Sequence, residues 1–221
     1  METEVFLAYE TARGNVFRLL SECYLMPSQQ MLGNIHELAE MLKSVCPEVV
    51  PHIGQLKSVS RHGWDIEKIN VDYARLFVGP YTLLAPPYGS VYLEGQRRVM
   101  GDTTLDVMQG YMEAGLSVSE DFRDAPDHIS AELEFMYYLV HKEIEAVAGG
   151  AYMIAADYLE KQKCFLENHL GVWISRFSTR VMENAHTEFY RALGTVTAQF
   201  VRANQEEMLR ISLRRIDELI S

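Results

Sequence analysis

Residues 126–147, PDHISAELEFMYYLVHKEIEAV, carry the clearest structural signal in the chain. Apolar residues recur there at intervals of four, three, four, four and three, at Ile129, Leu133, Met136, Val140, Ile144 and Val147. These intervals place all of them on one face of an α-helix. Asp127 stands where an N-cap residue would accept a backbone N–H, and Gly149-Gly150 supply a stop. The pattern predicts a long helix with one buried face.

The same periodicity predicts helices over most of the remaining chain. Helices joined by short loops favour the all-α class, as a single-domain helical bundle over residues 1–221. Strand signals are few, and the Val91-Tyr92-Leu93 run is short. Gly149-Gly150 marks either a hinge between two halves or, more commonly, a helix-ending turn. The expected helices are Val5–Leu25, Ile35–Val45, Asp65–Phe77, Thr103 or Thr104 to Ala114, Tyr152–Glu167, Val172–Glu183, His186–Ala203 and Gln205–Ile220.

The chain is acidic, with 31 Asp and Glu residues against 20 Lys and Arg and a formal charge of −11. Nucleic-acid binding depends on clustered basic side chains, so DNA and RNA partners are disfavoured. A basic peptide would instead be attracted by this charge. Acidity also serves solubility alone, so the charge by itself does not select a partner.

The cellular location is predicted from what the sequence lacks. Cys23, Cys46 and Cys164 lie far apart, so neither a disulfide framework nor a metal site is expected. The start of the chain carries acids where a signal peptide carries Lys or Arg. No apolar run approaches the roughly 20 residues of a membrane-spanning helix. We expect a cytoplasmic protein without stable membrane insertion and without a cofactor.

An irregular segment, GPYTLLAPPYGSVYLEGQRRVMGD, interrupts the helical pattern over residues 79–102. It holds three of the seven prolines, four glycines and three tyrosines. Long connections of this kind are uncommon in compact domains and are often functional. Its tyrosines offer contact area suited to a peptide, although core packing under a loop is the commoner role for each ring.

A second candidate lies at the start of the long helix. Asp127, His128 and Glu132 could form an acid–base or metal-binding cluster, as in a small helical metal-dependent hydrolase. A capping role for Asp127 is the commoner explanation. Phosphate-binding loops, nucleophile elbows and H-E-x-x-H are absent from the sequence. The acids that could receive basic side chains here are Glu120, Asp121, Asp124, Asp127, Glu132 and Glu134.

Several short motifs together resemble the TorD/DmsD family of redox-enzyme maturation chaperones, to which the nitrate reductase chaperone NarJ is more distantly related. They are YARLFVGP at 73–80, PPYGSVY at 86–92, PDH at 126–128 and ELEFM at 132–136. The stretch Cys164–Phe177 looks like the family's continuation. The resemblance covers roughly residues 10–200 in order.

The resemblance implies an all-α, non-enzymatic cytoplasmic chaperone. Its partner would be the apo-form of a molybdoenzyme catalytic subunit (or a tungsten enzyme) and the N-terminal twin-arginine signal peptide of that subunit. The chaperone would assist cofactor insertion and delay export until folding is complete. The sequence leaves open whether the chain is a monomer or a homodimer. Carried over by motif, the peptide-binding residues would be Tyr73, Leu76, Phe77, Gly79, Pro80, Pro87, Tyr92, Pro126, Asp127 and His128.

Overall fold

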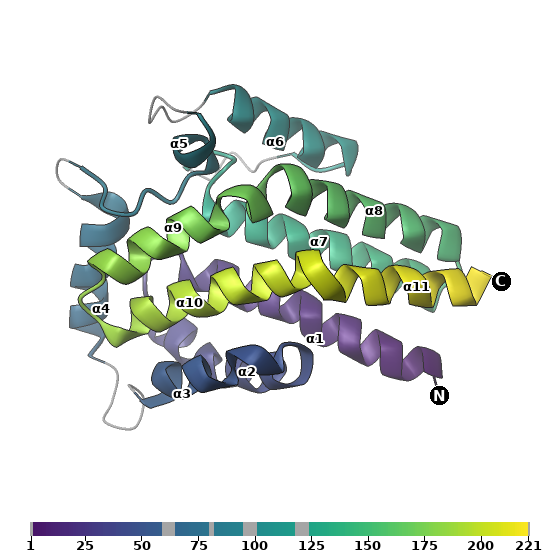
Figure 1. Ribbon diagram of the computed structural model, residues 1–221, viewed down its shortest axis with the longest axis horizontal. Helices are drawn as coiled ribbons and strands as arrows, with labels where there is room; N and C mark the ends of the chain where they lie inside the picture. Colours follow the sequence, from purple (N-terminus) through teal and green to yellow (C-terminus); the bar gives the residue numbers. More distant parts are fainter. Residues whose placement is uncertain (1, 59–64, 80–81, 95–100, 118–123, 221) are drawn as a thin grey trace.

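A computed structural model describes residues 2–58, 65–79, 82–94, 101–117 and 124–220 (Figure 1). Pro80, one of the expected binding residues, lies outside these ranges. The described part of the chain is helical, and its only β-type pairing is a single antiparallel bridge between Tyr88 and His128. The predicted all-α class is therefore confirmed. None of the described helices combines the length and the apolar character needed to traverse a bilayer.

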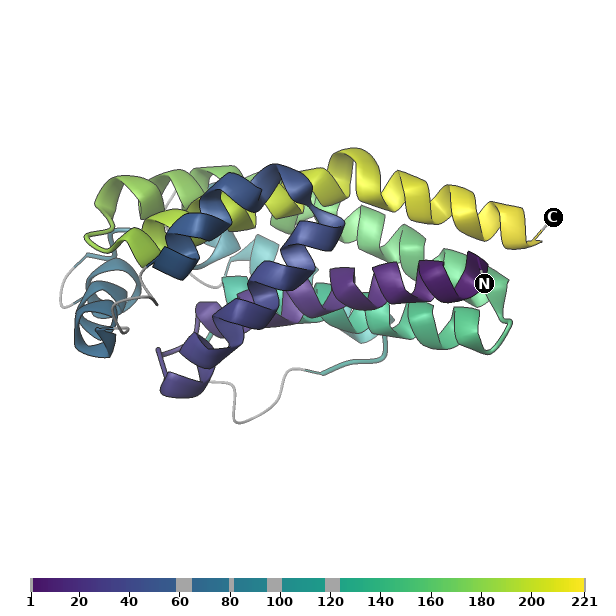
Figure 2. The ribbon, with the colours of Figure 1, turned by 90° about the horizontal axis from the view of Figure 1, so that it is seen from below.

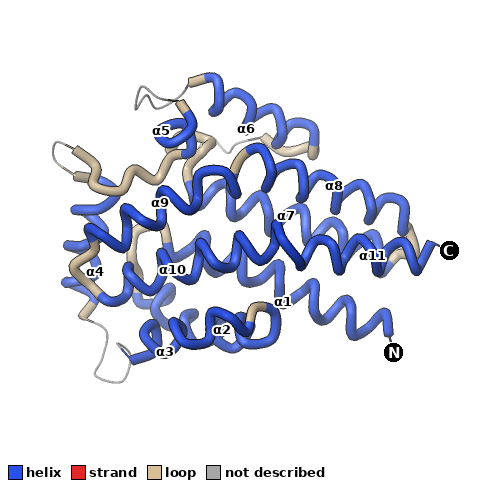
Figure 3. Tube along the Cα trace, viewed as in Figure 1, coloured by secondary structure: helices blue, strands red, loops and turns tan. Residues whose placement is uncertain are grey.

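Most of the helices follow one another with short connections (Figure 3). In chain order they are α1 (Glu2–Cys23), α2 (Gln29–Val45), the 3-10 turn η1 (Pro47–Val49), α3 (Val50–Ser58), α4 (Ile66–Tyr73), the π-helical turn η3 (Ala74–Val78), α5 (Gly89–Leu93), α6 (Asp102–Glu113), α7 (Ile129–Ala148), α8 (Tyr152–Asn168), α9 (Leu170–Asn184), α10 (Glu188–Ala203), the π-helical turn η4 (Asn204–Met208) and α11 (Leu209–Ile220). The longest connections precede α5 and α7.

Helices from both halves of the sequence share one hydrophobic core. Helix α1 packs along α7 and α2, α7 along α8, and α9 along α10. Helices α2 and α3 cover one side of this layer, and α5 and α6 lie on the opposite side (Figure 1). Helices α10 and α11 continue one another along the long axis, and both termini lie at the same end (Figures 1 and 2).

The long helix appears where the periodicity placed it, as α7. Five of its six pattern residues are buried and Ile144 is partly buried. The predicted N-cap was wrong, however. His128 is the N-cap, and its side chain accepts the Ser130 N–H, whereas the Asp127 carboxylate turns away from α7. At the other end Gly150 adopts a φ of 72°, which suits a glycine after a helix.

Other boundaries differ from the predictions for local reasons. Helix α2 begins earlier than expected because Ser28 caps it, with its hydroxyl accepting the Met31 N–H at 3.1 Å. Helix α3 was missed, since Pro47 and Pro51 fall in the first turns of η1 and α3, where proline is tolerated. Thr104 does not cap α6, which begins at Asp102.

The Val91-Tyr92-Leu93 run is part of α5 and not of a strand. The expected helix over residues 65–77 is confirmed with Asp65 as its N-cap, although its last turn is the wider π-helical η3. The helix expected over residues 205–220 likewise contains a π-helical turn, η4, before α11.

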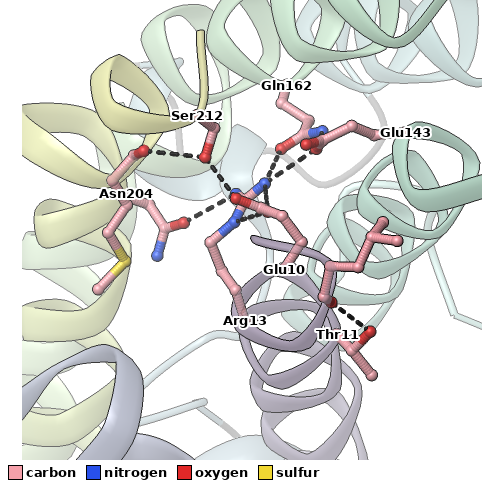
Figure 4. A network of polar contacts seen from close by, with 9 residues as sticks. Glu10, Thr11, Arg13, Glu143, Gln162, Asn204 and Ser212 are labelled. Carbon is pink, nitrogen blue, oxygen red and sulfur yellow. Dashed lines mark hydrogen bonds and ion pairs between the residues drawn. The ribbon is translucent and has the colours of Figure 1, made fainter. Parts of the chain in front are cut away.

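A fully buried arginine, Arg13 of α1, joins three other helical segments (Figure 4). Its guanidinium donates to Glu10 at 2.6 Å, Asn204 at 3.1 Å, Gln162 at 2.8 Å and Glu143 at 3.1 Å. Glu10 also accepts a hydrogen bond from Ser212 of α11. Two turns of α1 thus bind residues from α7, α8, η4 and α11.

The charges in this cluster nearly cancel. Burial raises the pKa of the Glu143 carboxyl, and the negative charge of Glu10 raises it further, against the opposing effect of Arg13. A protonated Glu143 leaves Arg13 and Glu10 as a single buried ion pair. A buried charge that loses its partner is costly, so each member depends on the others.

We expect Arg13→Ala to destabilise the protein by about 3–5 kcal/mol, because Glu10 would become an unpaired buried charge. Urea unfolding followed by circular dichroism measures this loss. Arg202→Ala is the matched control, since the Arg202–Glu206 pair is exposed and its removal should change the stability little. Equal losses in the two variants would contradict a central role for Arg13.

Candidate functional site

Seven of the ten expected binding residues are buried, which leaves little of the predicted set in contact with solvent. Tyr73 and Gly79 are half-buried, and Pro80 is outside the described residues. The buried ones are Leu76, Phe77, Pro87, Tyr92, Pro126, Asp127 and His128. These side chains mainly hold the long loop and α5 against the bundle.

Phe77 anchors the start of the loop. Its ring lies 5.4 Å from those of Tyr73 and Tyr190 and 6.0 Å from that of Tyr24, all edge-on. Gly79 then turns the chain with a φ of 50°, and a Cβ there would lie only 3.1 Å from the Thr82 carbonyl oxygen. Glycine is therefore required at position 79 for both conformation and space.

Tyr92 anchors the other end of this segment. Its ring stacks on Trp173 of α9 with centroids 5.5 Å apart. Phe177 lies between the two anchors, 6.2 Å from Tyr92 and 6.1 Å from Phe77. A continuous set of rings thus fixes η3 and α5 on the same face of α9.

Asp127 fastens α5 and α6 to the start of α7. Its carboxylate, which is fully buried, accepts the Ser90 N–H at 2.7 Å and the Thr104 hydroxyl at 3.1 Å, while its carbonyl accepts the Gly89 N–H at 2.9 Å. The Ser90 N–H belongs to the first turn of α5, where backbone donors lack helical partners. Asp127 has a structural role, and its contact with a ligand stays a prediction.

His128 completes the connection. The Ser130 N–H donates to its Nδ1 at 3.2 Å, so the neutral ring carries its proton on Nε2. The ring lies 5.3 Å from that of Tyr88. Burial lowers the pKa of His128 to about 4, despite the opposing charges of Asp124 and Asp127. The imidazole is therefore neutral at physiological pH.

The Glu132 side chain is also buried, and it faces Trp173 of α9. The Trp173 indole N–H donates to its Oε2 at 3.1 Å. Burial raises the pKa of Glu132 well above its usual range, and the charge of Asp127 adds to this effect. A Cβ at Gly89 would meet Glu132 Oε1 at 3.1 Å and Trp173 Nε1 at 3.0 Å, so the glycine allows α5 to approach.

The three residues of the hydrolase alternative do not converge. Asp127 faces Ser90 and Thr104, whereas His128 faces Ser130 and Glu132 faces Trp173. Across the described ranges, no three His, Cys, Asp or Glu side chains are grouped so that they could hold a metal ion. A metal-dependent hydrolase centred on these residues is not supported.

Tyr73, Tyr88 and Asp124 are accessible members of this region, and we call them the Asp124 patch. Asp124 is exposed, and it accepts a hydrogen bond from the Tyr88 hydroxyl at 2.8 Å. The pKa of Tyr73 and that of Tyr88 are both raised, first by burial and then by the charge of Asp124. The patch offers a carboxylate to a cation and two half-buried tyrosine side chains to an apolar group.

Asp124 was predicted among the acids that could receive basic side chains, but it was not one of the ten predicted binding residues. Asp124 and Asp127 are alike in type and three residues apart, yet one is exposed and the other fully buried. The signal that could have separated them is Pro126, whose carbonyl accepts the Tyr111 hydroxyl at 2.9 Å and so holds this part of the chain against α6. Trp173 lies in the Cys164–Phe177 stretch that resembles the family's continuation.

We expect Glu132→Gln to become progressively more stable than the natural protein as pH rises. The pKa of Glu132 is higher in the folded than in the unfolded chain, so its contribution to stability is lost as pH rises from about 4.5 through the folded pKa. Each pH unit in that window costs about 1.4 kcal/mol, which a glutamine avoids.

Urea unfolding between pH 7 and pH 9 measures this difference and leaves His128 neutral in both states. Glu134→Gln, which changes an exposed carboxylate of the same helix, should show no such trend. A constant difference between Glu132→Gln and the natural protein would mean that Glu132 is ionised in the folded state.

Comparison with known proteins places these features in a family. The family model described as "Nitrate reductase delta subunit" matches residues 29–179. The Tat proofreading chaperone DmsD of Salmonella typhimurium is 30% identical over 128 residues, which cover 58% of this chain and 56% of the relative. A perchlorate reductase assembly chaperone of Dechloromonas aromatica is 31% identical and is covered to 62%, as is this chain. The chain thus spans less than two thirds of either relative.

Two longer matches agree with this result. The chaperone protein TorD of Shewanella loihica is 25% identical over 89% of this chain and 93% of its own. A crystal structure from Archaeoglobus fulgidus, assigned provisionally to the redox enzyme maturation proteins, covers 88% of this chain with a TM-score of 0.50 and 22% identity, and shows the same fold. With the family model matching more than half of its length, the chain belongs to the nitrate reductase delta subunit family, which includes the TorD/DmsD-type chaperones that its motifs predicted.

Proposed function

We propose that the protein is a cytoplasmic chaperone for a molybdenum or tungsten oxidoreductase. It binds the N-terminal, twin-arginine signal region of the catalytic subunit before the cofactor is inserted, and it delays export until folding is complete. The chaperone acts by binding and carries out no catalytic step. The names of two relatives, a Tat proofreading chaperone and a perchlorate reductase assembly chaperone, support this proposal.

The observation that carries the proposal is the Asp124 patch. A twin-arginine signal presents guanidinium groups followed by an apolar segment, and the patch presents an exposed carboxylate beside two half-buried tyrosines. Guanidinium and carboxylate groups form charge-assisted hydrogen bonds, and aromatic rings accept both cations and apolar groups. The buried residues Phe77, Tyr92 and Asp127 hold the segments that carry the patch against the bundle.

Binding without turnover agrees with the chemistry of the buried groups. Asp127 has its carboxylate oxygens occupied by Ser90 and Thr104, and His128 is enclosed. A general base needs contact with the proton it removes, which neither residue offers to a substrate in solution. Recognition by the exposed Asp124 needs no such step.

We expect Asp124→Asn to weaken binding of a synthetic twin-arginine signal peptide by about three- to tenfold, or about 0.7–1.4 kcal/mol. The loss arises because the carboxylate charge that pairs with arginine is removed. Isothermal titration calorimetry measures the affinity, and the natural protein should lose affinity as salt increases.

Glu134→Gln is the control, because it removes the same charge from an exposed site on α7. Tyr88→Phe should have a smaller effect, since it removes only the hydroxyl that donates to Asp124. Equal affinity of Asp124→Asn and the natural protein would exclude this patch as the arginine site.

A pull-down from the source cell, with the tagged chaperone as bait, tests which client it binds. We expect a molybdoenzyme catalytic subunit that still carries its N-terminal signal to co-purify with the tagged chaperone, because the proposed contact is with that segment. Mass spectrometry identifies the subunit and its N-terminus. Recovery of only the mature, cofactor-loaded enzyme would contradict a role before export.

A further inference from the structure

A second recognition feature lies next to Tyr92. A cavity of about 600 Å³ opens between α5 and α9. We call it the Arg176/Arg180 pocket, and its lining combines two arginines and two hydroxyl side chains with a short apolar wall: Val91, Tyr92, Ser175, Arg176, Thr179, Arg180 and Glu183. The cavity is several times larger than a small inorganic anion requires.

Within the described ranges neither arginine has an acidic partner, although the chain carries a formal charge of −11. Arg176 is exposed and Arg180 is half-buried, one turn apart on α9. Among the ion pairs of the described residues, other exposed arginines such as Arg191 and Arg202 have carboxylates within 4 Å, but Arg176 and Arg180 have none. Glu183 lines the same pocket without pairing with either of them.

Tyr92 forms the buried side of the pocket next to these arginines. Its side chain is 8% exposed, and its hydroxyl has no hydrogen-bond partner within the described part of the chain. The Arg180 guanidinium lies 5.7 Å from the centre of the Tyr92 ring. The positive charges of Arg180 and Arg176 both oppose the rise that burial causes in the Tyr92 pKa.

Two guanidinium groups that line an open cavity make a binding site for an oxyanion. We propose that the Arg176/Arg180 pocket binds a carboxylate side chain of the polypeptide that the protein chaperones. The apolar wall of Val91 and Tyr92 and the volume suit a segment of peptide better than a free ion. This assignment of the partner rests on the proposed chaperone function.

The pocket and the Asp124 patch have opposite charges, and both include residues of α5 or next to it. Tyr88 stands immediately before α5 and Tyr92 is four residues further along, which corresponds to a rise of about 6 Å along a helix. A bound segment is therefore oriented, with its basic residue at Asp124 and its acidic residue at Arg176 and Arg180.

The pocket can be tested without a signal peptide. The probe is the blocked peptide Ac-Leu-Glu-Val-Glu-Leu-NH2, and its partner has both glutamates replaced by glutamine. Trp173, which stacks on Tyr92, reports binding through its fluorescence in a Trp64→Phe background, because the chain has two tryptophans. We expect the acidic peptide to bind at least tenfold more tightly than the glutamine peptide.

Arg176→Gln with Arg180→Gln should reduce affinity for the acidic peptide at least tenfold. Arg210→Gln with Arg214→Gln is the control, since it removes the same charge from exposed positions on α11. If the loss of Arg180 lowers stability, the affinity of the Arg176→Gln variant is measured instead, because Arg176 is exposed. Circular dichroism confirms the fold of each variant.

Three outcomes would overturn the proposal: equal binding of the two peptides, equal losses in the pocket and control variants, or tighter binding of inorganic phosphate than of the acidic peptide. The last would indicate a site for a small anion. Because the probe contains no basic residue, these outcomes are independent of the Asp124→Asn result. A chaperone that fails the Asp124 test can still pass this one, and the reverse also holds.

Discussion

The arrangement of the bundle depends on one buried guanidinium. Arg13 reaches residues that lie 130, 149 and 191 positions further along the chain, and each of them accepts a hydrogen bond from it. Apolar packing alone tolerates small shifts between helices, but a buried charge with five directional donors does not. The positions of α7 and α8 relative to α1 are therefore fixed, and α7 in turn carries the residues that hold the loop.

Hydrogen bonds to buried polar side chains also hold the loop and α5 in place. Asp127 satisfies the first turn of α5 and the Thr104 hydroxyl of α6, while Trp173 satisfies one oxygen of Glu132. Short helices such as α5 are not stable alone, because few of their backbone groups are paired. Buried polar side chains compensate for this deficit and leave Asp124, Tyr73 and Tyr88 at the surface. Structural and recognition roles are thus divided between residues that are neighbours in sequence.

The sequence predicted those features that repeat locally and missed those that depend on distant partners. The periodicity from Ile129 to Val147 located α7, since a helix presents its face through its own spacing. The N-cap was assigned to Asp127 instead of His128, because the decisive partners of Asp127 are Ser90 and Thr104, 37 and 23 residues away. The family motifs found the right region for a site. They could not separate buried members such as Phe77 from exposed neighbours such as Asp124.

The common position of the two termini has a practical consequence. Residues 188–220 form an almost continuous rod of about 50 Å, which runs from the neighbourhood of α4 to the end where the chain also begins (Figures 1 and 2). A fluorescent label or an affinity handle fused to either end would project away from α4, at the opposite end of the long axis. Such fusions can therefore be used to follow complex formation inside living cells without occupying the surface around α4.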